Sequence, residues 1–413
     1  MSPESARVAG SIESRELPMD AFSDLLRLPA SEKVALGVTY TVAEIAQQPD
    51  SWLSTFQLFR QKRAQIAEFL SNAGIGGRAG SGPTVFLVGA GTSDYIGQSL
   101  ASLLRKLWQC EVAAIPSTDL LTHMGDLMIR DRKYVWTSFS RSGDSPEGVA
   151  VLDLAHRNYP DVHHLVISCN ANGRMIRGNP GQSRALGICL DDAVNDRGLA
   201  MTSSFSNMVV FGQCLAHTED IGKYEAILPH VVQAGRTLMR PAANCAAALA
   251  QEQYTKVCFV GSGALRAVAK ESALKVLELT AGKTLTISES ALGLRHGPMA
   301  ALDKDTLFVC FLSGDRRVRR YELDLLEEVG RKKLVGARVV VAANDPPLKD
   351  SYAEHYVAPT SPIAVSDDYC GVVDVIFGQM LGLFFSLRWN LQPDHPSPNG
   401  AISRVVQNVK IHS

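Results

Sequence analysis

The sequence predicts an α/β protein made of two tandem doubly wound parallel-sheet domains, with a helical N-terminal arm and a C-terminal tail. Three observations lead to this prediction. Apolar, β-rich runs alternate with helix-like stretches, small-residue turns join them, and the same order restarts about 170 residues later. Alternating strands and helices are typical of a parallel sheet covered on both faces. Repetition of a whole unit indicates two copies of one domain.

Length and composition agree with this organisation. The chain has 413 residues, of which 46% are hydrophobic and 20% are charged. These values are typical of a soluble globular protein that is too long for one ordinary core. We expect an arm over residues 1–50, a first domain over 51–225, a second domain over 226–385 and a tail over 386–413.

The elements of the first half follow from its apolar pattern. The arm is polar and contains Pro18, Pro29 and Pro49, so we expect an irregular segment with one short helix. A helix is expected over residues 51–70. Five strands are expected over residues 84–88, 111–115, 134–137, 164–169 and 185–190, with helices that begin near Ser93, Ser145 and Ser206.

The second half repeats this pattern. The run that starts at Lys256 has the same order of residue types as the run that starts at Thr84, and residues 306–312 resemble the strand before Ser140. Four arginines, Arg316, Arg317, Arg319 and Arg320, open an amphipathic helix that continues through Glu327. We interpret this cluster as the solvated face of a helix.

Two small-residue turns predict the walls of one phosphate pocket. They are Val-Gly-Ala-Gly-Thr-Ser, residues 88–93, and Ser-Phe-Ser-Arg-Ser-Gly-Asp-Ser, residues 138–145. A turn between a strand and a helix presents N–H groups and hydroxyls at a positive helix N-terminus, which favours an anion. The hydroxyls available are those of Thr92, Ser93, Ser140, Ser142 and Ser145.

Other interpretations of these turns are weaker. A solvated turn is the main alternative for the second motif taken alone, because Ser, Gly and Asp are common in turns. A dinucleotide fingerprint lacks its third glycine, since Asp94 stands there, and no Gly-Lys-Ser/Thr of a Walker loop follows. In the second copy, Ala264-Leu265 and Arg316-Arg317 replace the hydroxyl residues. We therefore expect the anion site in the first copy only.

The second copy carries the candidate proton-transfer groups. Glu271, Lys275 and Glu278 share one face of a predicted helix, with the spacing i, i+4, i+7. The alternative is an exposed stripe stabilised by pairing of these charges. His296 precedes Gly297-Pro298, which forces a turn. It is either a structural hydrogen-bonding residue or a general acid/base that works near neutral pH.

Several classes of function are excluded by composition. A net charge of −1 argues against nucleic-acid partners and against an anionic membrane surface. The eight cysteines contain no Cys-x-x-Cys, and the ten histidines show no ligand spacing, so no metal and no cofactor are expected. There is neither an apolar signal core near the N-terminus nor a run of 18 apolar residues, so we expect a cytoplasmic protein without a membrane segment.

Four motifs, taken together, resemble a known family. Gly-x-Gly-Thr-Ser, Ser-Arg-Ser-Gly-Asp-Ser, Glu-Ser-Ala-Leu-Lys-x-x-Glu and Arg-His-Gly-Pro occur in that order on a duplicated α/β unit. This pattern resembles the double sugar isomerase (SIS) domain family, from about residue 51 to the end. Residues 396–409 look like the signature of its galactosamine-6-phosphate deaminase/isomerase subgroup, also called tagatose-6-phosphate ketose/aldose isomerases.

The resemblance implies roles for single residues. Glu278 matches the base that moves a proton between C1 and C2, His296 the histidine that opens the sugar ring, and Lys275 a lysine that lines the site. Arg404 is the nearest counterpart of a C-terminal lysine that closes the site in glucosamine-6-phosphate synthase. The implied substrate-binding residues are Gly91, Thr92, Ser93, Ser140, Arg141, Ser142, Gly143, Ser145, Leu199 and Ala200.

The reaction stays open among three readings. The first is a deaminase/isomerase that converts an amino-sugar 6-phosphate, with galactosamine 6-phosphate preferred, to tagatose 6-phosphate and ammonia. The second is aldose–ketose isomerisation without deamination. The third is a non-catalytic sugar-phosphate sensor, for which the arm is too short to supply a DNA-binding domain. Glutamine-dependent synthesis is not expected, because the chain lacks room for a glutaminase domain and begins Met-Ser.

The expected partner is therefore a small sugar phosphate. In the synthase that the motifs resemble, the ring-opening histidine comes from the neighbouring subunit. By resemblance we expect a homodimer or higher homo-oligomer with a shared active site.

Overall fold

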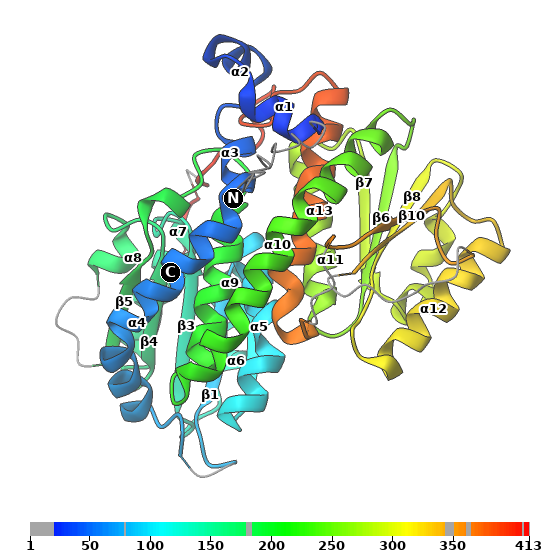
Figure 1. The fold of residues 1–413 in the computed structure, drawn as a ribbon. Helices are drawn as coiled ribbons and strands as arrows, with labels where there is room; N and C mark the ends of the chain where they lie inside the picture. The colour runs from blue at the N-terminus through cyan, green and yellow to red at the C-terminus, as the bar shows by residue number, and fades with distance from the viewer. Residues whose placement is uncertain are drawn as a thin grey trace, which may run out of the picture.

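The computed structural model describes residues 20–77, 80–178, 184–342, 351–360, 365–406 and 409–412. Two five-stranded parallel sheets, each with helices on its faces, stand side by side with three long helices between them (Figure 1). The predicted fold class, two tandem doubly wound α/β units, is confirmed. We call the half that contains β1–β5 the first lobe and the half that contains β6–β10 the second lobe.

The first lobe is built on a sheet with the strand order β2-β1-β3-β4-β5. In its register Val88 of β1 lies between Ile115 of β2 and Ser138 of β3, so the carboxyl ends of these strands are level. The turns that follow them consequently meet at one edge of the sheet. The strands are β1 (Thr84–Gly89), β2 (Val112–Pro116), β3 (Tyr134–Ser140), β4 (His163–Ser168) and β5 (Ala185–Cys189).

Helices cover both faces of this sheet because successive strand residues point to opposite sides. Val85 and Leu87 pack on one side with α5 (Thr92–Trp108) and α9 (Ser203–Ala216). Phe86 and Val88 pack on the other side with α6 (Ser117–Leu127) and α7 (Pro146–Asn158). Two short helices, α8 (Arg174–Arg177) and η1 (Asp192–Val194), lie in the connections around β5.

The second lobe repeats the topology. Its strand order is β10-β9-β8-β6-β7, so β6 corresponds to β1 and β8 to β3. The strands are β6 (Lys256–Gly261), β7 (Leu285–Ser290), β8 (Thr306–Phe311), β9 (Ala337–Val341) and β10 (His355–Val357). The helix α12 (Arg316–Arg331) covers one face, and η2 (Gly293–His296) and η3 (Pro298–Ala301) follow β7.

Three helices join the lobes. The helix α13 (Asp367–Arg388) packs against both α10 (Ile221–Ala250) and α11 (Leu265–Leu279), and α11 also contacts α5 (Figure 1). Within the described ranges, α13 is the one helix that is long and apolar enough to cross a membrane, and 89% of its apolar window is buried inside the protein. Its composition is that of a core helix.

The arm differs from the prediction. In place of one short helix, the structure has α1 (Ala21–Arg27), α2 (Ala30–Leu36) and α3 (Thr41–Ala46), followed by α4 (Gln48–Asn72). Pro29 caps α2 and Pro49 lies in the first turn of α4, where a proline starts a helix instead of breaking it. Helices of six or seven residues depend on tertiary packing, so their local pattern is weak.

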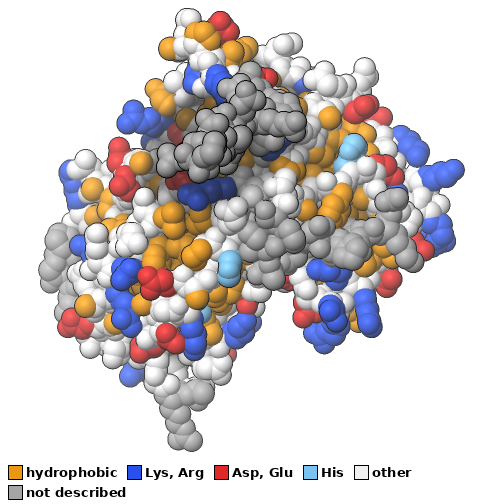
Figure 2. Space-filling model, in the orientation of Figure 1, with side chains coloured by type: hydrophobic (Ala, Val, Ile, Leu, Met, Phe, Trp, Pro, Cys, Tyr) orange, Lys and Arg blue, Asp and Glu red, His pale blue; other side chains and the backbone are white. Residues whose placement is uncertain are grey.

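The other predicted elements agree with the structure to within a few residues. The helices α6, α8, α10 and α13 and the strands β7, β9 and β10 had no predicted range. The predicted domain boundaries at 225/226 and 385/386 fall inside α10 and α13, and they stay predictions. Figure 2 shows acidic and basic side chains interspersed over one face of the molecule.

Candidate active site

The turn from β1 to α5 forms the first wall of the site. At Gly89 a Cβ would fall 2.3 Å from the backbone of Ser93, so only glycine fits. Gly91 has φ of 56° and stands directly before the helix. The 17-residue helix α5 therefore points its N-terminus, with Thr92 and Ser93, at the carboxyl edge of the sheet.

The loop from β3 to α7 forms the second wall. Gly143, with φ of 63°, makes the turn and donates its N–H to Ser140 Oγ at 3.0 Å. The N–H of Asp144 donates to Ser142 Oγ at 3.2 Å. Because each hydroxyl accepts a bond from the loop, its own O–H proton is free to be donated to a ligand.

A cavity of about 160 Å³ lies between the two walls. It has room for a phosphate group, and the N-termini of α5, α6 and α7 all surround it. The predicted residues in its lining are Ser93, Ser140, Arg141, Ser142, Ser145 and Arg404. Ser117, at the start of α6, and Ser138 also line it and were not predicted. The sequence signal that could have identified Ser117 is its position directly after the strand that ends at Pro116.

A second, larger cleft of about 1010 Å³ continues from this cavity. Ala90, Arg141, Met201, Arg404 and Val406 line both spaces, so they form one continuous depression. The cleft brings together Gly91 and Thr92 of the first lobe, Leu199 of the loop before α9, and Glu278 of the second lobe. Residues 397–403 of the tail form its remaining wall.

Glu278 faces this cleft from the end of α11, with 23% of its side chain exposed. Lys275 lies beneath it and is fully buried, with Nζ 2.6 Å from Glu278 and 3.3 Å from Glu271. The same ammonium group donates to Thr92 Oγ1 of the first lobe at 3.0 Å. Lys275 is not among the residues that line either cavity, and it supports Glu278 from behind; its place in the lining stays a prediction.

Burial controls the ionisation of this cluster. Loss of solvation raises the pKa of Glu271 to about 8, although Lys275 acts in the opposite direction. Loss of solvation lowers the pKa of Lys275, but the two carboxylates outweigh it and the net pKa is raised. The lysine therefore keeps its charge while buried between two acidic side chains.

Arg141 holds the loop that contains Leu199. It is buried, and its guanidinium donates to the carbonyls of Gly198 at 3.3 Å and Leu199 at 3.0 Å, and to the carbonyl of Arg404. Its hydrogen bonds are thus directed to the protein backbone at the point where the two cavities join. Ala200 is buried and lines neither cavity, whereas its neighbour Met201, which was not predicted, lines both.

Arg404 lies in the lining of both cavities, as the counterpart of a site-closing residue should. Its Nε donates to the carbonyl of Asp196 at 2.7 Å, and Nη2 donates to Asn195 Oδ1 at 2.6 Å. Its guanidinium therefore fastens the tail to the first lobe.

His296 lies apart from the other predicted residues. It is exposed on η2 and lines neither cavity. An ion pair of 2.8 Å between Arg266 and Glu289 places the end of β7, and η2 after it, beside the start of α11. Glu278 lies twelve residues further along α11, about 18 Å at 1.5 Å per residue. Within one chain, the segment that leads to His296 thus lies beside the start of α11, whereas Glu278 faces the cleft from the end of that helix.

The described residues contain no group of three or more His, Cys, Asp or Glu that could hold a metal ion. The chemistry available in the two cavities is that of hydroxyls, helix N-termini, the partly exposed carboxylate of Glu278, and the cationic side chains of Arg141, Lys283 and Arg404, with the Lys275 ammonium group buried behind Glu278. These groups suit the binding of an anion at one end and proton transfer at the other.

Comparisons with known proteins point in the same direction. The chain is 33% identical to the D-galactosamine-6-phosphate deaminase AgaS of Escherichia coli over 91% of this chain and 96% of that protein. It is 31% identical to the protein of the same name from Shewanella sp., over 96% of this chain and 97% of that protein. No protein-family model matches the chain.

Solved structures share the fold. The tagatose-6-phosphate ketose/aldose isomerase of Escherichia coli superposes with a TM-score of 0.80 at 30% identity, covering 91% of this chain and 96% of that one.

Proposed function

The chain belongs to the D-galactosamine-6-phosphate deaminase AgaS family, and we propose that it converts galactosamine 6-phosphate and water to tagatose 6-phosphate and ammonia. One observation carries this proposal. A cavity of the size of a phosphate group, lined by serines and helix N-termini, opens directly into the cleft where Glu278 is exposed.

The phosphate serves as a handle in this mechanism. Hydroxyls of Ser93, Ser140, Ser142 and Ser145 donate to it without bringing a charge of their own, and Arg141 and Arg404 lie in the same lining. Its binding energy positions the sugar carbons in the larger cleft. Arg141 acts on the substrate through the loop at Leu199, because its hydrogen bonds go to that backbone.

Glu278 then transfers the proton between C2 and C1. In the open-chain sugar its carboxylate takes the proton from C2, next to the C1 aldehyde, and returns it to C1, while the nitrogen loses a proton and the C1 oxygen gains one, so that C1 becomes an alcohol and C2 an imine. Water adds to the imine carbon, and both protons of the water pass to the nitrogen. The C–N bond then breaks, which releases ammonia and leaves the C2 ketone of the ketose phosphate. Lys275 holds the Glu278 carboxylate in place and offsets the negative charge that develops.

Ring opening requires a group that this chain does not bring to its own cleft. We assign it to His296 of a second copy, since His296 is exposed and lines neither cavity of its own chain, whereas Glu278 faces the larger cleft. The working form is then a homodimer or larger homo-oligomer with shared active sites.

The shared site is tested by complementation between subunits. In a mixed dimer of Glu278→Gln and His296→Ala chains, one site carries both changes and the other carries neither. Co-expressed variants should therefore recover turnover that neither homodimer has. Unmixed homodimers in equal amounts serve as the control, and absence of recovery in verified mixed dimers would assign His296 elsewhere.

The reaction itself is tested by an ammonia-release assay with galactosamine 6-phosphate, glucosamine 6-phosphate and tagatose 6-phosphate side by side. The proposal expects ammonia from galactosamine 6-phosphate in preference to its gluco isomer. Interconversion of tagatose 6-phosphate with an aldose phosphate, without ammonia from either amino sugar, would favour the isomerase reading.

We also propose a reducing compartment, the cytoplasm, as its location. All eight cysteines are free thiols, and six of them are buried.

A further inference from the structure

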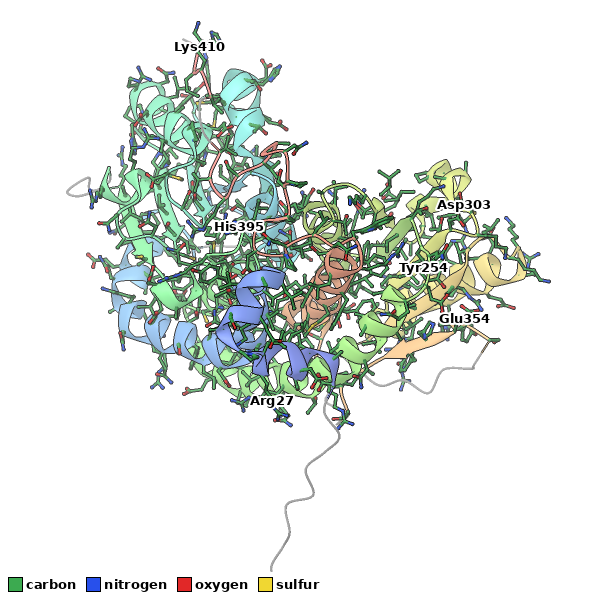
Figure 3. The ribbon with its side chains drawn as sticks, turned by 90° about the horizontal axis from the view of Figure 1, so that it is seen from above. Arg27, Tyr254, Asp303, Glu354, His395 and Lys410 are labelled. Carbon is green, nitrogen blue, oxygen red and sulfur yellow. The ribbon has the colours of Figure 1, made fainter. Side chains whose placement is uncertain are left out.

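The N-terminal helices and the C-terminal tail meet around Asp394. The side chain of this residue is 3% exposed, and its carboxylate accepts hydrogen bonds from the N–H of Tyr40 at 3.1 Å and from both the N–H and the Oγ1 of Thr41 at 2.8 Å. The Asp394 N–H donates to the carbonyl of Gly37 at 2.8 Å. In Figure 3 the tail passes the neighbouring His395 beside the N-terminal helices and runs on to Lys410 over the first lobe.

The same junction reaches the floor of the cleft. The carbonyl of Asp394 accepts the N–H of Leu199 at 3.0 Å. From α3, Glu44 Oε1 accepts the N–H groups of Arg197 at 2.5 Å and Gly198 at 3.2 Å. The arm and the tail thus bind the backbone of the loop 195–201 from its buried side.

The other side of this loop faces the proposed substrate. Leu199 and Met201 line the cleft, and Arg141 donates to the carbonyl of Leu199. The layer is thin at Gly198, where a Cβ would come within 2.8 Å of Thr41 Oγ1. At this point the backbone of the loop 195–201 lies between the N-terminal helices and the cleft.

We propose that Asp394 is a positioning residue of the active site, and that the N-terminal helices are the support through which it acts. Asp394 lines neither cavity, so it does not touch the substrate. It fixes the loop at Leu199 and the start of the tail segment that walls the cleft. This role rests on the proposed function, because it concerns the site at which that reaction takes place.

The chain offers a matched pair of variants. Thr41 and Thr55 are both buried, and each donates one side-chain hydrogen bond, to Asp394 at 2.8 Å and to Asn207 Oδ1 at 2.7 Å. Only Thr41 belongs to the junction at the loop. Thr41→Val and Thr55→Val should lose similar amounts of stability, because each loses one buried hydrogen bond, but only Thr41→Val should impair the site.

The experiment compares Asp394→Ala, Thr41→Val and Thr55→Val in the full-length protein. We expect kcat/KM to fall at least tenfold in Asp394→Ala and about threefold in Thr41→Val, and to stay within twofold of wild type in Thr55→Val. Amide hydrogen exchange at residues 197–201 should accelerate in the first two variants and not in the third. If Asp394→Ala does not fold, Thr41→Val against Thr55→Val carries the test.

Two results would overturn the proposal. One is equal loss of activity in Thr41→Val and Thr55→Val at equal loss of stability, which would make the effect a general one. The other is unchanged exchange at residues 197–201 in the junction variants. The exchange comparison needs no substrate, so it still decides the matter if the wild-type protein releases no ammonia and the proposed reaction is wrong.

Discussion

The two lobes share one topology but use the corresponding loops in opposite ways. After β3 the loop with Ser142 opens into a cavity of about 160 Å³. After β8 the corresponding loop is filled by the chain itself: Asp367 accepts the N–H of Gly314 at 2.7 Å and the hydroxyl of Ser313 at 2.5 Å. Glu322 accepts the N–H of Ser313 at 2.8 Å.

A loop that favours an anion therefore occurs in both lobes, and the difference lies in which anion occupies it. In the second lobe, carboxylates of α12 and α13 take the place that a phosphate would need. That lobe contributes instead Glu278, from the opposite end of the helix that follows its first strand. The duplicated fold thus supplies one binding end and one reacting end.

The contact of Lys275 with Thr92 of the first lobe is buried, and its loss should lower both stability and activity more than the other changes described below. Lys275→Met removes the ammonium that joins Thr92 to Glu278, and it leaves Glu278 without its ion pair and Glu271 without the cation beside it. We expect a loss of about 3–5 kcal/mol in unfolding free energy and loss of turnover, measured by urea denaturation and ammonia release.

Lys270→Met is the control, because this lysine also reaches the first lobe, at Gln98, but from a half-buried position. It should cost about 1 kcal/mol at most. Comparable losses in the two variants would show that the buried cluster has no special role in joining the lobes.

Ser142 of the first lobe and Ser313 of the second lobe occupy corresponding loops, so the same substitution can be compared in both. Ser142→Ala removes a donor to the phosphate, so KM for the sugar phosphate should rise about 10–100-fold, since hydrogen bonds to charged groups contribute about 1.5–3 kcal/mol. Ser313→Ala removes a donor to Asp367 and should leave KM within about twofold while costing about 1 kcal/mol of stability. A rise in KM in both variants, or in neither, would contradict the assignment of the anion site to the first lobe alone.

The lobes also hold their loops with buried carboxylates of different origin, Glu322 from within the second lobe and Glu44 from the arm. Burial, with a smaller contribution from Asp196, raises the pKa of Glu44 from 4.5 to about 7. Between these values the folded protein holds a proton that the unfolded chain has released, so stability falls as the pH rises from about 4.5 to 7.

Glu44→Gln removes this titration. The stability of the variant relative to wild type should therefore improve by about 2 kcal/mol between pH 5 and pH 8, as measured by chemical denaturation at each pH. A difference that does not change with pH would show that Glu44 is ionised throughout this range.

The sequence identified the local parts of this site and not its long-range contacts. The phosphate loops could be predicted because the glycines, the serines and the strands before them are adjacent in the chain. Helix spacing places Lys275 on one face with Glu271 and Glu278, but it does not show that Thr92, 183 residues away, covers this lysine. Asp394 was missed for the same reason, because its partner Thr41 lies 353 residues away.

The central claim is that an anion-binding end in the first lobe and the Glu278 carboxylate of the second lobe act on one molecule. Calorimetric titration of the Glu278→Gln variant with galactosamine 6-phosphate, with ammonia release measured on the same sample, tests it most directly. We predict binding within about threefold of the wild-type KM and turnover reduced by at least about 10³-fold. Loss of binding with turnover retained would show that Glu278 binds the substrate and is not the base.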